Sequence, residues 1–215
     1  TYVCDEPFYA HYLRMTGLPH PGHDEVIASQ ENDWRKVAGW LTGPVPESKS
    51  IFYQKHMAHH LLPGMGREWL SQVTNCFLIR DPRSMLLSLD AKYPNPMLSD
   101  TGLPQQWEVF ETVRRQTGRV PPVMDARDLL MNPRVLLQKL CDALQIPFSE
   151  RMLNWPPGPR ATDGVWAKHW YDAVWKSTGF QPFQDQAGDL PSHLKPLHRQ
   201  CIELYDALHA QRLTT

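Results

Sequence analysis

Residues 75–88 read Asn75-Cys-Phe-Leu-Ile-Arg-Asp-Pro-Arg-Ser-Met-Leu-Leu-Ser88, and this segment is the most informative one for the fold. A short apolar run ends at Arg80, and Asp81-Pro82 then starts a helical pattern. Aspartate suits the N-cap of a helix and proline suits its first position, because neither uses a backbone donor that the helix needs. The stretch therefore predicts a strand that runs directly into a helix.

The same junction carries groups that suit a phosphate. Ser84 and Ser88 are four residues apart, so they share one face of the predicted helix. The planar guanidinium of Arg80 matches two phosphate oxygens at once. An arginine in a structural ion pair, with serines that only face solvent, fits the same residues. Taken alone, the junction leaves both interpretations open.

Alternating strands and helices predict an α/β fold with a mostly parallel sheet. The apolar runs are short and mostly not alternating, as in strands that are buried on both faces. The predicted strands are Tyr2–Cys4, Ser50–Gln54, Thr74–Ile79 and Pro122–Met124, and the predicted helices between them are Pro7–Met15, Asp33–Leu41, Pro82–Leu89 and Gln105–Gln116.

One domain over residues 1–215 is expected from the length of the chain. Residues 1–131 would form the sheet, and residues 132–215 would be a mainly helical part that covers it. Helical patterns follow Asn132-Pro133 and run over His193–Leu213. The segment between them, from Trp155 to Gly164, is rich in proline and glycine and is predicted to be a loop.

Composition excludes several classes of function. The formal net charge of −1 argues against broad binding of nucleic acid, which needs a basic surface. No apolar run approaches the roughly 20 residues that span a bilayer. The four cysteines are scattered without a close pair, which argues against a metal finger or a redox pair and fits a reducing cytosol. We therefore expect a cytoplasmic protein without a membrane span.

Three histidines lie close together in Lys55-His56-Met-Ala-His59-His60. His56 and His60 have the spacing of zinc proteases, but the glutamate that should follow the first histidine is Met57. A second interpretation makes His56 a general base at the end of a strand, with Lys55 supplying positive charge to a leaving oxygen. In a third interpretation, His56 has only a structural role, with its hydrogen bonds made by neighbouring groups, and Lys55 lies in solvent. No metal site is expected.

Together, three segments resemble the sulfotransferase family. Lys55-His-x4-Leu-Leu-Pro63 looks like that family's strand and turn with the catalytic histidine. Arg80 to Ser88 looks like its motif for a 3′-phosphate. The segment from Met124 through Asn132-Pro133 to Glu150 is similar to the strand, capped helix and Leu-Pro-Phe-Ser turn that follow in many members.

The resemblance implies a three-layer sandwich with a central, mostly parallel sheet of the P-loop-like type. It implies transfer of a sulfuryl group from 3′-phosphoadenosine 5′-phosphosulfate to a small hydroxyl or amine acceptor, which leaves adenosine 3′,5′-bisphosphate. His56 would be the base and Lys55 would assist it, while Arg80, Ser88 and Arg160 would bind the cofactor.

The chain departs from the family pattern at the other end of the cofactor. No glycine-rich loop that could cradle a phosphate occurs in the 215 residues, so the first strand and the phosphosulfate-binding loop are expected to be missing. Two further hypotheses therefore stay open: a truncated binding module that pairs as a homodimer across an exposed sheet edge, and a related nucleotide-binding phosphotransferase.

Aromatic residues in and after the proline-rich loop raise a separate question about the acceptor. They could floor an acceptor pocket, or they could simply pack in the core. They are Trp155, Trp166, Trp170, Tyr171 and Trp175.

Overall fold

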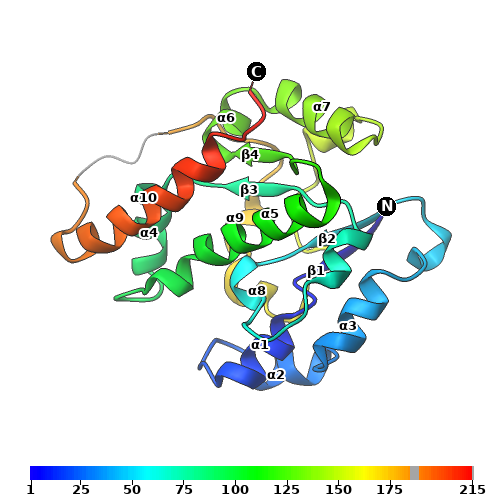
Figure 1. Cartoon of the computed structure of the whole chain (residues 1–215), viewed down its shortest axis with the longest axis horizontal. Helices are drawn as coiled ribbons and strands as arrows, with labels where there is room; N and C mark the ends of the chain where they lie inside the picture. Colours follow the sequence, from blue (N-terminus) through cyan, green and yellow to red (C-terminus); the bar gives the residue numbers. More distant parts are fainter. Residues whose placement is uncertain (185–188, 215) are drawn as a thin grey trace. The chain divides into compact units, whose positions relative to one another are not determined.

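The computed structural model describes residues 1–184 and 189–214, which form two compact units (Figure 1). The first unit contains Thr1–Val73 and Pro156–Thr178, and the second contains Thr74–Trp155 and the described residues of Gly179–Thr215. Each unit has its own two-stranded parallel sheet, and each is described by itself. A single domain over residues 1–215 stays a prediction.

In the first unit, β1 (Tyr2–Asp5) pairs in parallel with β2 (Phe52–Lys55). The register sets Asp5 opposite Lys55 where both strands end. Because parallel strands end at the same edge of a sheet, an acid and a lysine become neighbours there. The helices of this unit are α1 (Tyr9–Thr16), α2 (His23–Ser29), α3 (Trp34–Leu41), α8 (Ala167–Trp170) and α9 (Asp172–Lys176).

Local signals set the ends of these helices. α1 stops at Gly17, whose φ of 66° is left-handed and lets its N–H donate to the carbonyl of Leu13 at 2.8 Å. The side chain of Asp33 caps α3 by accepting from the N–H of Arg35 at 2.9 Å. α1 and α2 pack over a core that includes Trp166 of the returning segment. Its buried residues are Tyr9, Ala10, Tyr12, Leu13, Val26 and Trp166.

In the second unit, β3 (Phe77–Ile79) pairs in parallel with β4 (Val123–Asp125). β3 leads directly into a helix whose N-cap is Asp81, which accepts from the N–H of Ser84 at 2.8 Å. The strand–helix junction predicted from the sequence is therefore confirmed. The helices of this unit are α4 (Pro82–Asp90), α5 (Leu103–Thr117), α6 (Ala126–Met131), α7 (Pro133–Leu144) and α10 (Lys195–His209).

A buried carboxylate joins three elements of the second unit. Asp125, at the end of β4, is 1% exposed and caps α6 by accepting from the N–H of Arg127 at 2.9 Å. Its other oxygen accepts from the hydroxyl of Tyr205 on α10 at 2.8 Å. Burial and this hydrogen bond raise the pKa of Tyr205. Two apolar clusters complete the packing: Leu86, Leu103, Leu194 and Cys201, and Met124, Leu129 and Leu136.

The α/β class, the four strands and their parallel pairing agree with the sequence prediction. α2, α6, α8 and α9 were not predicted. Because each sheet has two strands, one central sheet in a three-layer sandwich stays a prediction. Within the part of the chain that the structure describes, no helix is long and apolar enough to cross a membrane.

Truncating a core leucine of the second unit should be costly. Leu86 on α4 is fully buried, so Leu86→Ala should lower the free energy of unfolding by about 2–5 kcal/mol through lost transfer energy and a cavity. Leu78→Ala is the matched control, because Leu78 is 53% exposed and should cost less than about 1 kcal/mol. Urea unfolding measures both; equal losses would contradict the packing described for α4.

Candidate functional site

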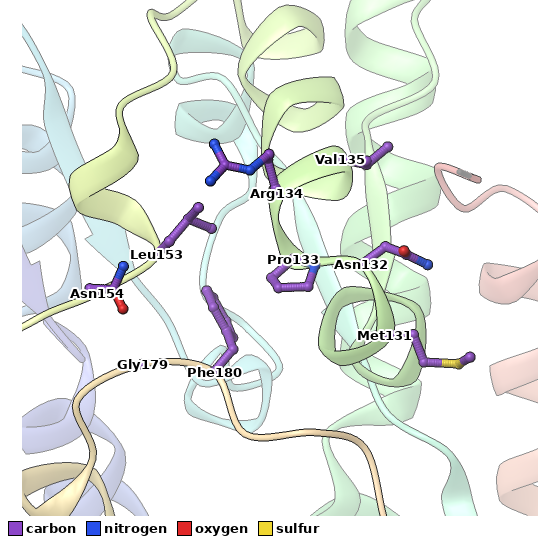
Figure 2. A pocket seen from close by; sticks show the side chains of 9 residues that line it. All are labelled: Met131, Asn132, Pro133, Arg134, Val135, Leu153, Asn154, Gly179 and Phe180. Carbon is purple, nitrogen blue, oxygen red and sulfur yellow. The ribbon is translucent and has the colours of Figure 1, made fainter.

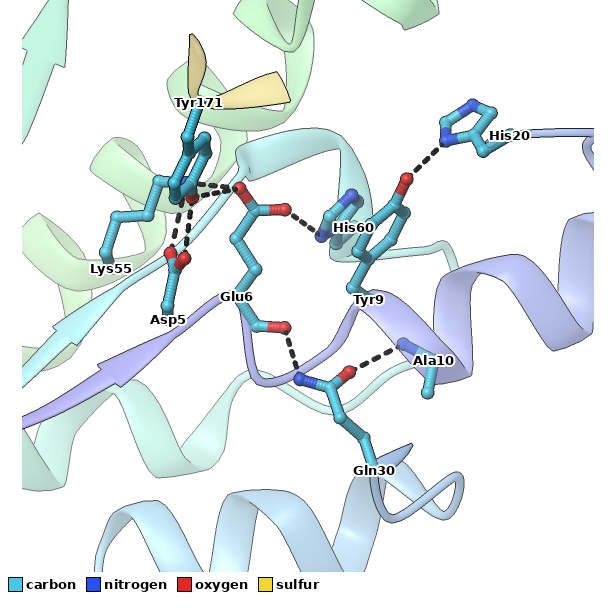
Figure 3. A network of polar contacts seen from close by, with 9 residues as sticks. All are labelled: Asp5, Glu6, Tyr9, Ala10, His20, Gln30, Lys55, His60 and Tyr171. Carbon is cyan, nitrogen blue, oxygen red and sulfur yellow. Dashed lines mark hydrogen bonds and ion pairs between the residues drawn. The ribbon is translucent and has the colours of Figure 1, made fainter. Parts of the chain in front are cut away.

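A network of charged side chains lies where β1 and β2 end (Figure 3). The ammonium of Lys55 forms an ion pair with Glu6 Oε1 and lies 3.2 Å from Asp5 Oδ1. It also donates to the hydroxyl oxygen of Tyr171 at 2.9 Å. The Tyr171 hydroxyl in turn donates to Asp5 Oδ2 at 2.6 Å. One cation therefore holds two carboxylates, and a tyrosine from the returning segment completes the group.

Glu6 is held in an unusual backbone conformation. Its φ of 45° is left-handed, which is uncommon for a residue with a side chain. Its N–H donates to the Lys55 carbonyl at 2.9 Å, and its own carbonyl accepts from Gln30 Nε2 at 3.1 Å. Gln30 Oε1 then accepts from the N–H of Ala10 at 3.0 Å. Strain that is fixed by several contacts is typical of functional positions.

Burial changes the proton affinity of this carboxyl group. Glu6 is 7% exposed, and burial raises its pKa, while Lys55 opposes the shift. Burial alone would lower the pKa of Lys55, but the charge and hydrogen bond of Glu6, with help from Tyr171 and Asp5, raise it. Lys55 therefore stays charged, and Glu6 becomes a stronger base than an exposed glutamate.

His56 follows directly after β2 and is only partly exposed. Its ring lies 5.6 Å from the ring of Phe8 and 5.8 Å from that of Trp69, between centroids. Its Nε2 is 3.4 Å from Gln54 Oε1. Burial, with a smaller effect of the Lys55 charge, lowers the pKa of His56 to about 4. The imidazole is therefore neutral at pH 7.

Arg80 and Ser88 belong to the second unit. Arg80 follows β3 and is exposed, and it makes no hydrogen bond or ion pair with residues 1–184 or 189–214. Ser88 is exposed on α4. The structural ion pair that the sequence left open for Arg80 is therefore not formed with the described residues.

Arg160 lies in the first unit, within the loop predicted from the sequence. Its backbone N–H donates to Asp163 Oδ2 at 2.8 Å, and its guanidinium donates to the Pro156 carbonyl at 3.3 Å. The structure thus brings Lys55 together with Asp5 and Glu6. His56 and Arg160 belong to the same unit as this network, and Arg80 and Ser88 belong to the other.

Asp5 and Glu6 were not predicted as site residues from the sequence, and Tyr171 was considered only as an aromatic residue of an acceptor pocket or of the core. A signal existed for the two acids, because Asp5-Glu6 follows one predicted strand as Lys55 follows the next. Parallel strands bring such residues to one edge. Tyr171 had no comparable signal, since it is 116 residues from Lys55. Among the aromatic residues that follow the proline-rich loop, Trp166 is 2% exposed and packs in the core.

Among the described residues, one cavity adjoins Gln30, which hydrogen-bonds to the Glu6 carbonyl, and another lies in the second unit. One of about 420 Å³ in the first unit has Cys4, Val37 and Trp40 in its lining. Another of about 390 Å³ in the second unit lies beside the start of α7, where Figure 2 shows Phe180, Pro133 and Leu153 around it. The described residues contain no group of three or more histidine, cysteine or acidic side chains that could hold a metal ion.

Comparison with known proteins gives the chain a family likeness over almost its whole length. A family model described as "Sulfotransferase domain" matches residues 1–212. Branched-chain-amino-acid aminotransferase-like protein 2 of Arabidopsis thaliana is 35% identical over 206 residues, which cover 96% of this chain and 36% of that protein. Its counterpart, protein 1, is 36% identical over 214 residues, covering 98% and 37%.

The chain therefore spans about a third of the length of these curated relatives. Among solved structures, the sulfotransferase domain from the curacin biosynthetic pathway matches with a TM-score of 0.47 and 13% identity. That match covers 95% of this chain and 78% of the other.

Removing the cation of the network should destabilise the first unit. Lys55→Met leaves Asp5 and Glu6 close together without a positive charge, so the free energy of unfolding should fall by about 1–3 kcal/mol at pH 7. The loss is limited because the Lys55 side chain is 35% exposed, so that solvent screens its charge.

The double variant Lys55→Met, Glu6→Gln tests the cause of that loss. Removing one negative charge should recover part of the stability in urea unfolding at pH 7. The surface variant Lys36→Met is the control, because Lys36 is 70% exposed beside Glu31. A double variant no more stable than Lys55→Met alone would show that the carboxylates do not cause the loss.

Proposed function

Because this chain belongs to the sulfotransferase family, we propose that it transfers a sulfuryl group to a hydroxyl or amine of a small-molecule acceptor. The donor in the proposal is 3′-phosphoadenosine 5′-phosphosulfate, which supplies an activated sulfuryl group when bound. The residues of the chain have two tasks: to bind the 3′-phosphate and to take the proton that the acceptor loses.

The state of Arg80 is the observation that carries the proposal. It is exposed, and its guanidinium is not engaged by the described residues, so it is available to a phosphate. Ser88 on α4 would add a hydroxyl donor. Arg160 is the third candidate ligand, although its guanidinium already donates to the Pro156 carbonyl. These three residues are proposed to bind the 3′-phosphate of the donor, so substitutions of them test binding of that phosphate.

Two groups compete for the role of proton acceptor. His56 is the base expected from the sequence, and it is neutral at pH 7, but its pKa of about 4 makes it a weak acceptor. Glu6 is buried, is held in a left-handed conformation and has a raised pKa. We therefore propose Glu6 as the acceptor and keep His56 as the alternative.

The proton transfer balances with either group. As the acceptor oxygen or nitrogen bonds to sulfur, its proton passes to the base, and the bond from sulfur to the bridging oxygen breaks. Lys55 was expected to stabilise charge on that oxygen. Its three N–H donors already face Glu6, Asp5 and Tyr171, so we propose that its main task is to hold Glu6.

The remaining expectations belong to the same proposal. They are one domain, a three-layer α/β arrangement of the P-loop-like type, a cytoplasmic location and association of two copies. The two Arabidopsis relatives are named aminotransferase-like and are about three times as long as the matched part. A non-catalytic binding module within a longer protein is therefore the second candidate function, and it predicts nucleotide binding without turnover.

Binding of the 3′-phosphate should depend on Arg80. We expect adenosine 3′,5′-bisphosphate to bind more tightly than adenosine 5′-phosphate in calorimetric titration. Arg80→Ala should weaken the bisphosphate about 10–100-fold, because a charge-assisted hydrogen-bond pair is lost, and should leave the monophosphate unchanged. Arg119→Ala, an exposed arginine in the same unit, is the control. Equal affinity for the two nucleotides would contradict the proposal.

The pH dependence of turnover should identify the base. Glu6 must be ionised to take a proton, so kcat should rise with pH through a value above the ordinary pKa of glutamate. Glu6→Gln should lower kcat about 10²–10⁴-fold. His56→Asn should cost much less. An acid limb near pH 4 that disappears in His56→Asn would instead identify His56, whose pKa is about 4.

A further inference from the structure

His60 is a buried histidine for which the proposed reaction has no stated use. It ends the short helix Ala58–His60, is 3% exposed and lies 4.0 Å through Nδ1 from Glu6 Oε2. Figure 3 shows the ring beside the Glu6 carboxylate. Nδ1 has no hydrogen-bond partner among the described residues. A buried polar atom without a partner is costly, so its retention needs a reason.

Two tyrosines of α1 fix the orientation of this ring. The Tyr9 ring stacks on it with centroids 4.7 Å apart and planes at 8°. The Tyr12 ring lies 4.7 Å away at 31°. Tyr9 is itself held by a hydrogen bond of 2.8 Å between its hydroxyl and His20 Nδ1. The His60 ring is therefore held by contacts with both tyrosine rings, with Nδ1 on the side of Glu6 Oε2.

The two oxygens of Glu6 have different surroundings. Oε1 faces Lys55 and is 3.4 Å from the Tyr171 hydroxyl. Oε2 has His60 Nδ1 as its polar neighbour. The separation is about 1 Å longer than a hydrogen bond, and such bonds are often long in a catalytic site without its substrate. Accepting from an imidazole N–H would leave Oε2 a second lone pair for a proton from the acceptor.

We propose that His60 is a positioning residue that donates an Nδ1–H hydrogen bond to Glu6 Oε2 and holds the carboxylate ready to take a proton. The inference rests on the proposed function of Glu6. The imidazole stays neutral, because burial first of all, and then its electrostatic interactions with Lys55 and the neighbouring histidines, lower the pKa of His60 well below its ordinary value. A neutral ring carries one N–H, and the geometry assigns it to Nδ1.

Other titratable groups lie around His60 and Glu6. Asp5, Lys55 and Tyr171 face Glu6. Tyr9 and Tyr12 pack on His60, and His20, His56, His59 and Lys55 influence it electrostatically. These groups are unchanged in a variant of His60 alone. A shift of the acid limb of the kcat–pH profile in such a variant therefore reports on the interaction between His60 and Glu6.

The first test uses the pH profile of kcat. His60→Phe keeps a ring against the two tyrosines but removes the donor. It should lower kcat about tenfold and move the acid limb upward by about one pH unit, because the ionised carboxylate loses a hydrogen bond. His60→Asn places an amide donor near the position of Nδ1. It should restore most of kcat and most of the position of the acid limb, with KM for the acceptor unchanged.

His11→Phe is the control for the loss of any buried histidine. His11 is 8% exposed, and its Nδ1 contacts the Asn32 carbonyl at 2.8 Å, away from Glu6. That variant should lower stability without moving the acid limb. A His60→Phe profile that superimposes on the wild type, or a His60→Asn variant no better than His60→Phe, would overturn the proposal.

A second readout does not depend on activity. ¹⁵N NMR of histidine-labelled protein should show His60 protonated at Nδ1 near neutral pH, with the Nδ1–H signal shifted in Glu6→Gln. An Nε2–H tautomer would overturn the proposal even if a variant of His60 fails to fold. If Glu6→Gln keeps full activity, the proposed role of Glu6 fails, while the NMR result still decides whether the two side chains share a hydrogen bond.

Discussion

The ion pair of Lys55 with two carboxylates is the constraint on which the first unit depends. The parallel register of β1 and β2 brings Asp5 and Lys55 to one edge, and Glu6 follows in a left-handed conformation. Two acids this well buried would repel each other without a cation. Lys55 therefore stabilises the ends of both strands, and burial, which Lys55 only partly offsets, leaves Glu6 with a raised pKa.

In the second unit, the end of β3 also carries a charged group, Arg80, but no described side chain pairs with it. Asp81 caps α4 and Asp125 caps α6, so both acids are used by the backbone. Arg80 remains exposed and unengaged within the described residues. A cation that the described residues do not engage is suited to an anionic ligand, as the proposed role of Arg80 requires.

Local sequence signals predicted much of the fold but only part of the candidate site. The cap and proline at Asp81-Pro82 located α4, and apolar runs located four strands, because these features depend on neighbouring residues. Glu6, Tyr171 and His60 gained their significance only from contacts between distant parts of the chain. Tyr171 and Asp5, for example, are 166 residues apart. The weak basicity of His56 likewise follows from burial against Phe8 and Trp69, which sequence spacing does not show.

The pKa of the Glu6 carboxyl group decides whether this side chain can take the proton of the acceptor. It can be followed by ¹³C NMR titration of glutamate-labelled protein, with the signal assigned from its loss in Glu6→Gln. We expect a pKa above the ordinary value of glutamate, and a further rise in Lys55→Met, because burial raises the pKa and Lys55 opposes that rise. A pKa at or below the ordinary value would show that Lys55 outweighs burial and would contradict Glu6 as the proton acceptor.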